Sequence, residues 1–518
     1  MTNHASILRS LVIYGICLPL AILLGYLLTT PDLLLRPDNA SFGTIGVVFV
    51  ILVIPILLRF HHIFLVASWN VSMVLFFLPG RPDLSLALAI ISFMICVGHR
   101  TLDKRFRFLP APEISRPLIA LVVVIIITAE ATGGIGIRSI GSDVYGGKRY
   151  LVMIGGILGY FALTSKRIPL EHANWYLALF FLPGMCSFVQ DWYSLSGPFT
   201  RYLFLLFPPT VVGPTELGVT RFGGLSLGAS MIFCYMMARY GIKGIFTANR
   251  PWRAVFFLLF SGIGLYGGFR STLLAFFIAF TFQFFLEGVH RTKLMPIFLF
   301  LIVSVVAVSA PFIQRMPQTI QRSFAFIPFA PIDPVIRQSA EASSDWRIRM
   351  WKVALPEVPK YLLIGKGYGM SAQDFAFAND ASLSRSATGD DWWGAMAAGD
   401  YHNGPLSVII TFGAWGMMAF LWLVWSGAHA LYDNYRYGDE RLKTINTFLL
   451  AYFLARVVMF FFIVGGFSAD LTAFLGILGL GVGMNGGVAW RPEPAPPVSA
   501  KAGNLADLLP QPKSAFSR

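Results

Sequence analysis

The residues best suited to chemistry lie in segment 401–405, which reads Tyr-His-Asn-Gly-Pro and directly precedes a long apolar run. Pro405 predicts the start of a membrane helix, because proline is well tolerated at the first position of a helix. His402 therefore lies just outside a helix N-terminus, where partial positive charge favours anions, and its neutral ring accepts protons near physiological pH. Gly413 and Gly416 follow about three and nearly four helical turns later. The segment predicts a site for chemistry on an anionic substrate at the edge of a bilayer.

Further candidate site residues are one amide, Asn403, and three cations that lie elsewhere in the sequence. Asn403 can donate and accept hydrogen bonds beside the histidine. Arg270 lies in a very short turn between two apolar spans, where a guanidinium could clamp a phosphate or extend to lipid headgroups. Arg347 shares a helical face with Trp351, which permits cation–π support, although an ordinary solvated face explains both residues equally well. Arg221 adds positive potential on the same side of the membrane.

The composition identifies the class of protein in which these residues lie. The chain has 518 residues, of which 56% are hydrophobic and only 13% charged. Repeated apolar runs of about twenty residues are typical of polytopic helical membrane proteins. The net charge of +14 could suggest a nucleic-acid partner, but the basic residues fall mainly in short loops between apolar runs, as positive-inside topology requires. Nucleic acid is therefore excluded as the expected partner.

The apolar runs number about fourteen, so the predicted fold is an all-α, polytopic transmembrane helical bundle. They lie near 8–28, 42–58, 61–78, 84–98, 117–132, 149–164, 170–189, 223–240, 251–268, 271–287, 294–311, 405–427, 444–465 and 470–489. The basic loops share one side, which the positive-inside rule assigns to the cytoplasm together with both termini. We predict a single membrane domain over 1–490 and a disordered cytoplasmic tail over 491–518, which is rich in Pro, Ala, Ser and Lys.

The long loop 312–404 is predicted to be the extracytoplasmic, catalytic part of that domain. Segment 343–345 offers N-cap residues, and apolar residues then recur at helical spacing up to Pro356. We expect an amphipathic helix that lies on the outer membrane surface with its apolar face down. Segment 365–369 is glycine-rich but lacks the spacing of a P-loop, so it predicts a turn.

Together these motifs resemble the superfamily of O-antigen ligases and polymerases of the bacterial envelope. The late signature of that superfamily is His, then Asn, Ser or Gln, nine residues, Gly, two residues, and a small or aromatic residue. Here it is met in full by His402, Asn403, Gly413 and Gly416. Further likenesses to the superfamily fall on Arg270, on Arg347 with Trp351, and more loosely on Arg221. The matches cover roughly 220–425, while the first 200 residues agree only in hydropathy.

The resemblance implies an inverting, metal-independent glycosyltransferase without a cofactor. Its donor would be a glycan on undecaprenyl diphosphate, and its acceptor a sugar hydroxyl of a lipid A core or another glycan. The site would face the periplasm from the bacterial inner membrane. The resemblance implies that His402 and Arg270 are catalytic, that Arg347, Arg221, Asn403 and Trp351 bind the diphosphate or the sugars, and that Gly413 and Gly416 are structural. Related metal-dependent enzymes use an acidic motif in the first outer loop, where this chain offers only the separated Asp32 and Asp38.

Two alternatives to ligation stay open. A polymerase of the same superfamily would use the same carrier and leaving group to extend a lipid-linked chain. A transporter or flippase for a lipid-linked substrate would also explain many helices and outward arginines, but it predicts charges in mid-span and broken helices in symmetric halves. Mid-span charges are scarce in this sequence, which favours the enzyme.

Overall fold

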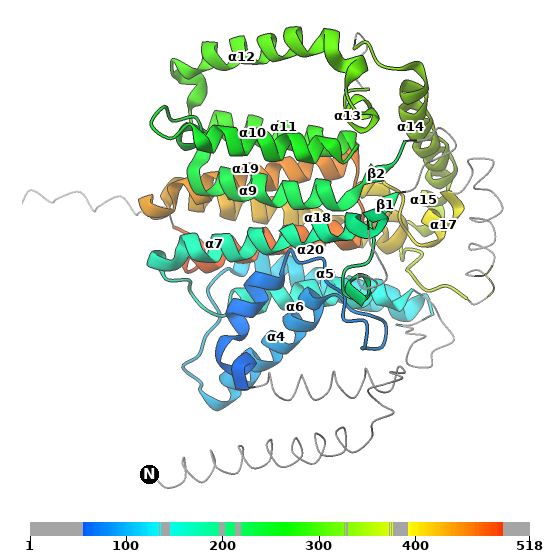
Figure 1. Ribbon diagram of the computed structural model, residues 1–518. Helices are drawn as coiled ribbons and strands as arrows, with labels where there is room; N and C mark the ends of the chain where they lie inside the picture. The colour runs from blue at the N-terminus through cyan, green and yellow to red at the C-terminus, as the bar shows by residue number, and fades with distance from the viewer. Residues whose placement is uncertain are drawn as a thin grey trace, which may run out of the picture.

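The computed structural model describes residues 55–133, 135, 146–195, 202–212, 219–325, 327, 330–371, 373, 376 and 392–490. These residues form a bundle of helices with one small sheet (Figure 1). Six helices in the described part are long and apolar enough to cross a membrane, and three shorter apolar helices accompany them. The prediction of an all-α membrane protein is confirmed, whereas the number of spans and their orientation stay predictions. The first predicted span and the C-terminal tail lie outside the described residues.

The long helices follow the predicted apolar runs closely from residue 84 onward. They are α4 (Leu84–Leu102), α5 (Pro112–Ala131), α6 (Gly147–Leu163), α7 (Ala173–Phe181), α9 (Gly223–Ile245), α10 (Trp252–Tyr266), α11 (Arg270–Leu286), α12 (Leu294–Ser309), α18 (Gly404–Tyr437), α19 (Lys443–Val458) and α20 (Phe467–Asn485). Helix α7 continues as the 3₁₀ segment η3 (Leu182–Leu195), and α19 continues as the π-helical segment η10 (Met459–Ile463). Buried aromatic side chains of α18, α19 and α20, including Phe420, Phe453 and Phe474, pack into one hydrophobic core.

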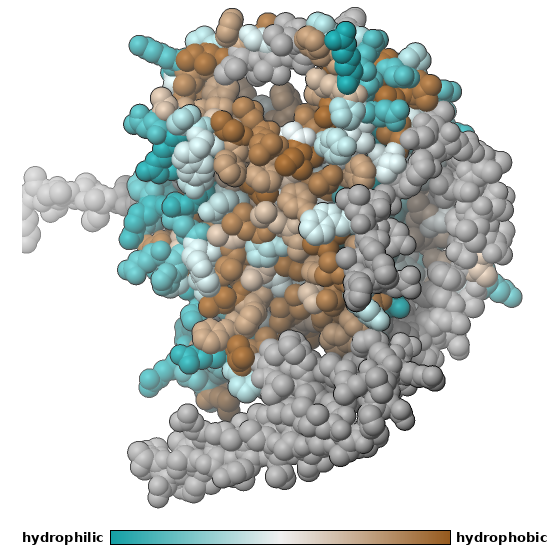
Figure 2. Space-filling model, in the orientation of Figure 1, coloured by the Kyte–Doolittle hydropathy of each residue, from teal (hydrophilic) through white to brown (hydrophobic). Residues whose placement is uncertain are grey.

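Shorter elements gather at one end of the bundle, on the right in Figure 1. They are α8 (Leu203–Leu206), β1 (Val211–Val212), β2 (Arg221–Phe222), α13 (Gln318–Ser323), α14 (Pro334–Ala354), α15 (Val358–Tyr361) and α17 (Trp392–Ala397). Strands β1 and β2 pair antiparallel, with Val211 opposite Phe222. We call this end of the bundle the site end. Figure 2 shows a hydrophobic band across the middle of the visible face and hydrophilic side chains at the opposite end and near α14, as a membrane-spanning bundle requires.

The structure contradicts the predicted span over 61–78. A helix covers Pro55–Ser68 and so crosses the predicted boundary at Arg59, and the chain from 69 to 83 is not helical. The Val74 backbone N–H donates to the Leu206 carbonyl over 2.8 Å, and Val74 also forms an isolated bridge with Asp83. Hydropathy alone cannot show that distant segments, rather than a helix, satisfy the backbone of this apolar run.

The loop helix also differs from its prediction. Helix α14 begins at Pro334, where the Asp333 side chain accepts a hydrogen bond from Val335 N–H over 2.8 Å, so segment 343–345 lies inside the helix rather than at its N-cap. The predicted end near Pro356 is correct. The predicted apolar face does not lie open toward a membrane, because Met350 and Ala354 are fully buried against α17 and α18. The helix therefore serves as a cover over the site end.

Candidate active site

The turn between α10 and α11 fixes Arg270 at the first position of α11. Gly268 has φ of +78°, a left-handed conformation that glycine adopts without strain. The Phe222 N–H donates to the Gly267 carbonyl over 3.0 Å, and Arg322 Nη1 donates to the Gly268 carbonyl over 3.1 Å. The turn is thus tied to β2 on one side and to α13 on the other.

The Arg270 side chain connects α11 to the loop helix α14. Its Nη2 donates to the Ala340 carbonyl over 2.9 Å and lies 3.1 Å from Ser344 Oγ. Protein groups therefore hold this guanidinium, in contrast to an arginine that extends to lipid headgroups. A cation at a helix N-terminus adds to the partial positive charge of the helix instead of offsetting it. The position is electrostatically unfavourable unless an anion is present.

Three further guanidinium groups lie around Arg270. The four arginines of this cluster, named the arginine cluster below, are Arg221, Arg270, Arg322 and Arg347. The pKa of Arg322 falls to about 10, first because its side chain is buried and then because the other three cations lie close. Burial and then the charges of Arg270 and Arg221 also lower the pKa of Arg347, while Asp400 acts in the opposite direction. A multiply charged anion would offset the repulsion among these four partly buried cations.

Each arginine reaches the cluster from a different element. Arg221 belongs to β2, directly before α9, and its guanidinium carbon lies 5.4 Å from the centre of the Phe269 ring. Arg322 belongs to α13 and is 5% exposed, and Arg347 belongs to α14. Long-range packing therefore brings together cations that lie far apart in the sequence.

His402 lies in a constrained turn beside α14. Its φ of +47° is uncommon for a residue other than glycine. Its Nδ1 lies 3.0 Å from Asp400 Oδ1, and its backbone N–H donates to the same oxygen over 3.1 Å. The Trp346 ring stands edge-on to the imidazole, with centroids 5.3 Å apart, and Trp351 Nε1 donates to the Tyr401 carbonyl over 2.8 Å. Helix α14 thus contributes both an arginine of the cluster and the aromatic residues that hold the histidine turn.

Hydrogen bonds and a nearby cation help to keep Asp400 ionised. Burial favours the neutral acid, but the hydrogen bonds from His402 and the charge of Arg149 of α6 act in the opposite direction, and the pKa of Asp400 lies below its usual value. Arg149 is itself placed over the ring of Tyr368, 5.4 Å from its centre. Asp400 also lies close enough to Arg347 to affect its pKa, so the histidine turn and the arginine cluster are neighbours.

A break in α18 anchors the loop that follows α15. At Gly413 the backbone leaves the helical conformation, with φ of +68° and ψ of −166°. The carbonyls of Ile410 and Thr411 accept hydrogen bonds from the N–H groups of Lys366 and Gly367 over 2.7 and 2.9 Å. The glycine-rich segment is therefore an irregular connection that docks against α18, with the turn at 362–364 just before it, and its amides replace those that the break removes from α18.

The two glycines of the signature allow this break. A β carbon at Gly413 would lie 2.7 Å from the Leu362 carbonyl oxygen, and an L side chain would be strained at its φ. A β carbon at Gly416 would meet the displaced Phe412 side chain. The structure is consistent with a structural role for both glycines.

Asn403 has a defined structural contact. Its Oδ1 accepts from the Leu406 N–H over 3.0 Å, which caps the N-terminus of α18. The helix begins at Gly404 with Pro405 next, so the predicted helix start is confirmed. The Trp351 side chain is likewise engaged by the chain itself, through the Tyr401 carbonyl. The predicted roles of both residues in substrate binding stay predictions.

Sequence reasoning missed three charged residues of the site. Arg322 carries no local signal that separates it from the other cations of the long loop. Arg149 follows a segment of no recognisable motif. Asp400 could have been found, because an acid two residues before a histidine often hydrogen-bonds the following backbone.

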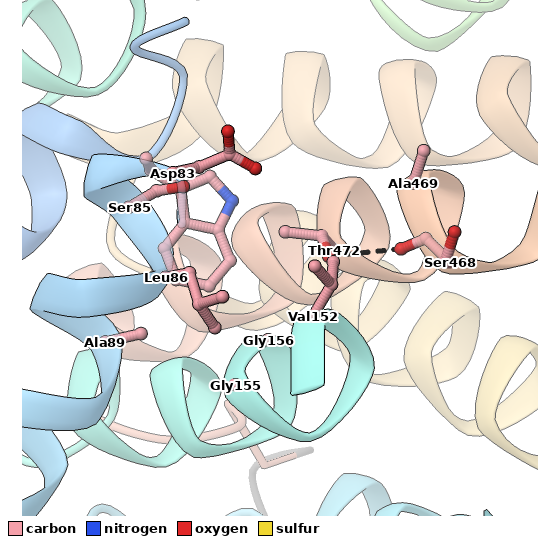
Figure 3. A pocket seen from close by; sticks show the side chains of 11 residues that line it. Asp83, Ser85, Leu86, Ala89, Val152, Gly155, Gly156, Ser468, Ala469 and Thr472 are labelled. Carbon is pink, nitrogen blue, oxygen red and sulfur yellow. Dashed lines mark hydrogen bonds between the residues drawn. The ribbon is translucent and has the colours of Figure 1, made fainter. Parts of the chain in front are cut away.

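A separate cavity of about 260 Å³ lies between α4, α6 and α20. Figure 3 shows Asp83, Ser85 and Leu86 on one side of it and Ser468 and Thr472 on the other. The cavity is lined by none of the arginines of the cluster and not by His402. It therefore belongs to the packing of the bundle rather than to the site that the motifs predicted.

Comparison with known families supports the same region. Residues 254–421 match the family model described as O-Antigen ligase. The matched region contains Arg270, Arg322, Arg347 and the complete His402 signature, and it leaves Arg221 outside. Among curated proteins none matches the chain.

Proposed function

Because residues 254–421 belong to the O-antigen ligase and polymerase superfamily, we propose that the protein is a membrane glycosyltransferase of the ligase type. It would transfer a glycan from undecaprenyl diphosphate to a hydroxyl group of an acceptor sugar. The observation that supports this function most directly is the meeting of the arginine cluster with His402 and Asp400 at one end of the bundle.

The arginine cluster suits the diphosphate of the donor. As the glycosidic bond breaks, negative charge develops on the leaving diphosphate, and fixed cations stabilise that charge most when they are held in place beforehand. Arg270 is held by α14 and Arg322 by the α10–α11 turn. Because the donor would be a lipid, its headgroup would lie at the membrane surface, where the polar site end of the bundle would meet it.

His402 suits the acceptor. A sugar hydroxyl is a weak nucleophile, and a positioned base that takes its proton contributes about 10²- to 10⁴-fold to the rate. The acceptor oxygen would attack the anomeric carbon, the bond from that carbon to the diphosphate oxygen would break, and the diphosphate would leave with the electron pair. The proton would pass to the imidazole, and the anomeric configuration would invert.

The test is transfer by purified protein in a bilayer, with an undecaprenyl-diphosphate glycan and with or without a lipid A core acceptor. His402→Ala should abolish transfer at a normal protein level. His429→Ala is the matched control, because His429 lies in α18, the helix that follows His402, near the end of it that is farther from the site, and contacts Asp433. Product that requires the core identifies a ligase, and extension of the lipid-linked chain without the core identifies a polymerase.

Two results would contradict this scheme. Full transfer by the His402→Ala protein would remove the base from the mechanism. Movement of the lipid-linked glycan across the bilayer without any new glycosidic bond would instead favour a transporter. A chelator should leave turnover unchanged, and a loss restored by divalent cation would show that the transfer depends on metal.

A further inference from the structure

We propose that Asp400 is a positioning residue that fixes the tautomer and orientation of the His402 ring for proton transfer. This inference rests on the proposed function, in which His402 accepts the proton of the acceptor hydroxyl. It assigns a role to a residue that lies outside the His402 signature of the superfamily.

The protonation of the two partners follows from their contact. An ionised carboxylate carries no proton and can only accept hydrogen bonds. Because Asp400 Oδ1 lies 3.0 Å from His402 Nδ1, the proton of the neutral imidazole must be on Nδ1. The lone pair is then on Nε2, at the opposite edge of the ring. A base needs that lone pair free, so the contact selects the tautomer that can act on a hydroxyl group.

The backbone holds Asp400 in place for this contact. The Asp400 N–H donates to the Ala395 carbonyl at the end of α17 over 2.8 Å. The carboxylate of Asp400 receives the His402 backbone N–H as well as the ring, which stabilises the left-handed conformation of His402. The residue before α20, Gly466, packs against the carboxylate of Asp400, since a β carbon at this glycine would lie 3.6 Å from Oδ1.

The nearby cations explain why the pair can act at neutral pH. Arg149 and Arg347 approach Asp400 from α6 and α14 and favour its ionised form. The carboxylate in turn stabilises the imidazolium that forms when His402 takes up a proton. The negative charge of Asp400 thus offsets the repulsion between the arginine cluster and a protonated His402.

A purely structural role is the alternative, because the Asp400 contact with the His402 backbone is also an ordinary Asx turn. Asparagine keeps an oxygen that can accept from the His402 backbone N–H and from Nδ1–H, as Asp400 Oδ1 does, but it carries no charge. Asp400→Asn therefore removes only the charge that stabilises the imidazolium, whereas Asp400→Ala also removes the acceptor that fixes the tautomer. Asp345→Asn is the matched control, since Asp345 is an exposed acid on α14.

The experiment compares these variants by steady-state transfer kinetics and by ¹⁵N NMR of histidine-labelled protein, with His402→Ala identifying the His402 signal. We expect Asp400→Asn to lower kcat at least about 100-fold with the KM for the donor changed less than about 3-fold. We expect Asp400→Ala to be similar and Asp345→Asn to match wild type. The His402 signal should show the proton on Nδ1 in wild type and in Asp400→Asn, and a loss of that tautomer in Asp400→Ala.

Three outcomes would overturn or separate the proposals. Wild-type kcat in Asp400→Asn would show that the charge of Asp400 has no part in proton transfer. An unchanged His402 tautomer in Asp400→Ala would remove the positioning role whatever the kinetics. If wild-type protein transfers no glycan but the tautomer changes as expected, the geometry of the pair is upheld and the proposed transferase function fails.

Discussion

Two arginine sites at the same end of the bundle differ in where their partners come from. Arg456, at the end of α19, forms an ion pair of 2.6 Å with Asp470 of α20, and the second oxygen of Asp470 accepts the Gly466 N–H over 2.9 Å. In the arginine cluster, by contrast, every cause that acts on the pKa of Arg322 lowers it. Arg456 has a carboxylate partner within the chain, whereas the four arginines of the cluster lie close to one another.

This difference separates structural cations from functional ones. Removing a charge from water is costly, so a partly buried cation is retained only where a partner offsets that cost. For Arg456 the partner is a carboxylate that also begins α20. Among the described residues no ion pair neutralises the arginines of the cluster, and the proposed diphosphate would supply the negative charge. This distinction is wrong if Arg456 proves to bind the substrate or if the arginines of the cluster prove to be structural.

The largest expected effect is the loss of transfer when Arg270 is changed. Arg270→Ala should lower kcat/KM by about 10³-fold, because a fixed cation would no longer meet the charge that develops on the diphosphate. Arg270→Lys should recover little, since an ammonium group lacks the bidentate fork. The assay is transfer from a lipid-linked donor by protein at matched level in the membrane. Near-normal transfer by Arg270→Ala would place this arginine with the structural cations.

Arg456→Met should have its largest effect on folding. It leaves the Asp470 carboxylate partly buried without its cation, which costs about 3–5 kcal/mol of unfolding free energy. The double variant Arg456→Met/Asp470→Leu should recover most of that loss, because neither charge then remains. Thermal unfolding in detergent checks the prediction. If the single variant were as stable as wild type while losing donor binding, the ion pair would belong to the substrate site.

Arg347→Met should show the opposite pattern. Its loss relieves repulsion from Arg270 and Arg221, so the thermal stability of the free protein should stay equal or rise. Binding of undecaprenyl diphosphate should weaken about 10- to 100-fold, as expected for the loss of hydrogen bonds to a charged group. Wild-type protein should gain thermal stability when this ligand is added, and the variant should gain less. Equal ligand effects in the two proteins would separate Arg347 from the diphosphate.

The features that could be predicted from the sequence are those that depend on a local pattern of residues. Hydropathy located the apolar helices α4, α5, α6, α7, α9, α10, α11, α12, α18, α19 and α20, because a membrane helix satisfies its own backbone and needs only an apolar run. The start of α18 followed from Pro405, whose ring suits the first position of a helix. Likewise, His402 stood out because the motif that contains it is continuous in the chain.

The sequence could not predict partners that only the packed structure supplies. Arg322 joins the cluster through the α10–α11 turn, more than fifty residues earlier in the chain. The apolar run over 69–78 is not helical because its backbone bonds elsewhere, as Val74 does with Leu206. The N-cap of α14 is Asp333, although segment 343–345 has equally suitable residue types, because capping depends on where the helix is free to begin.

The smallest predicted effect concerns Asn403, which lies beside His402 but already has a partner in the chain. If its role is the helix cap, Asn403→Ala should cost about 1 kcal/mol of unfolding free energy, and Asn403→Asp should cost little because a carboxylate caps equally well. Transfer by Asn403→Asp should then stay near wild type, since the Leu406 N–H keeps its acceptor. A cap-preserving variant that folds normally but loses transfer at least tenfold would instead show that the amide binds substrate. Asn403 would then join the arginine cluster among the residues whose partner is the substrate, and the late signature would contain two residues that contact it rather than one.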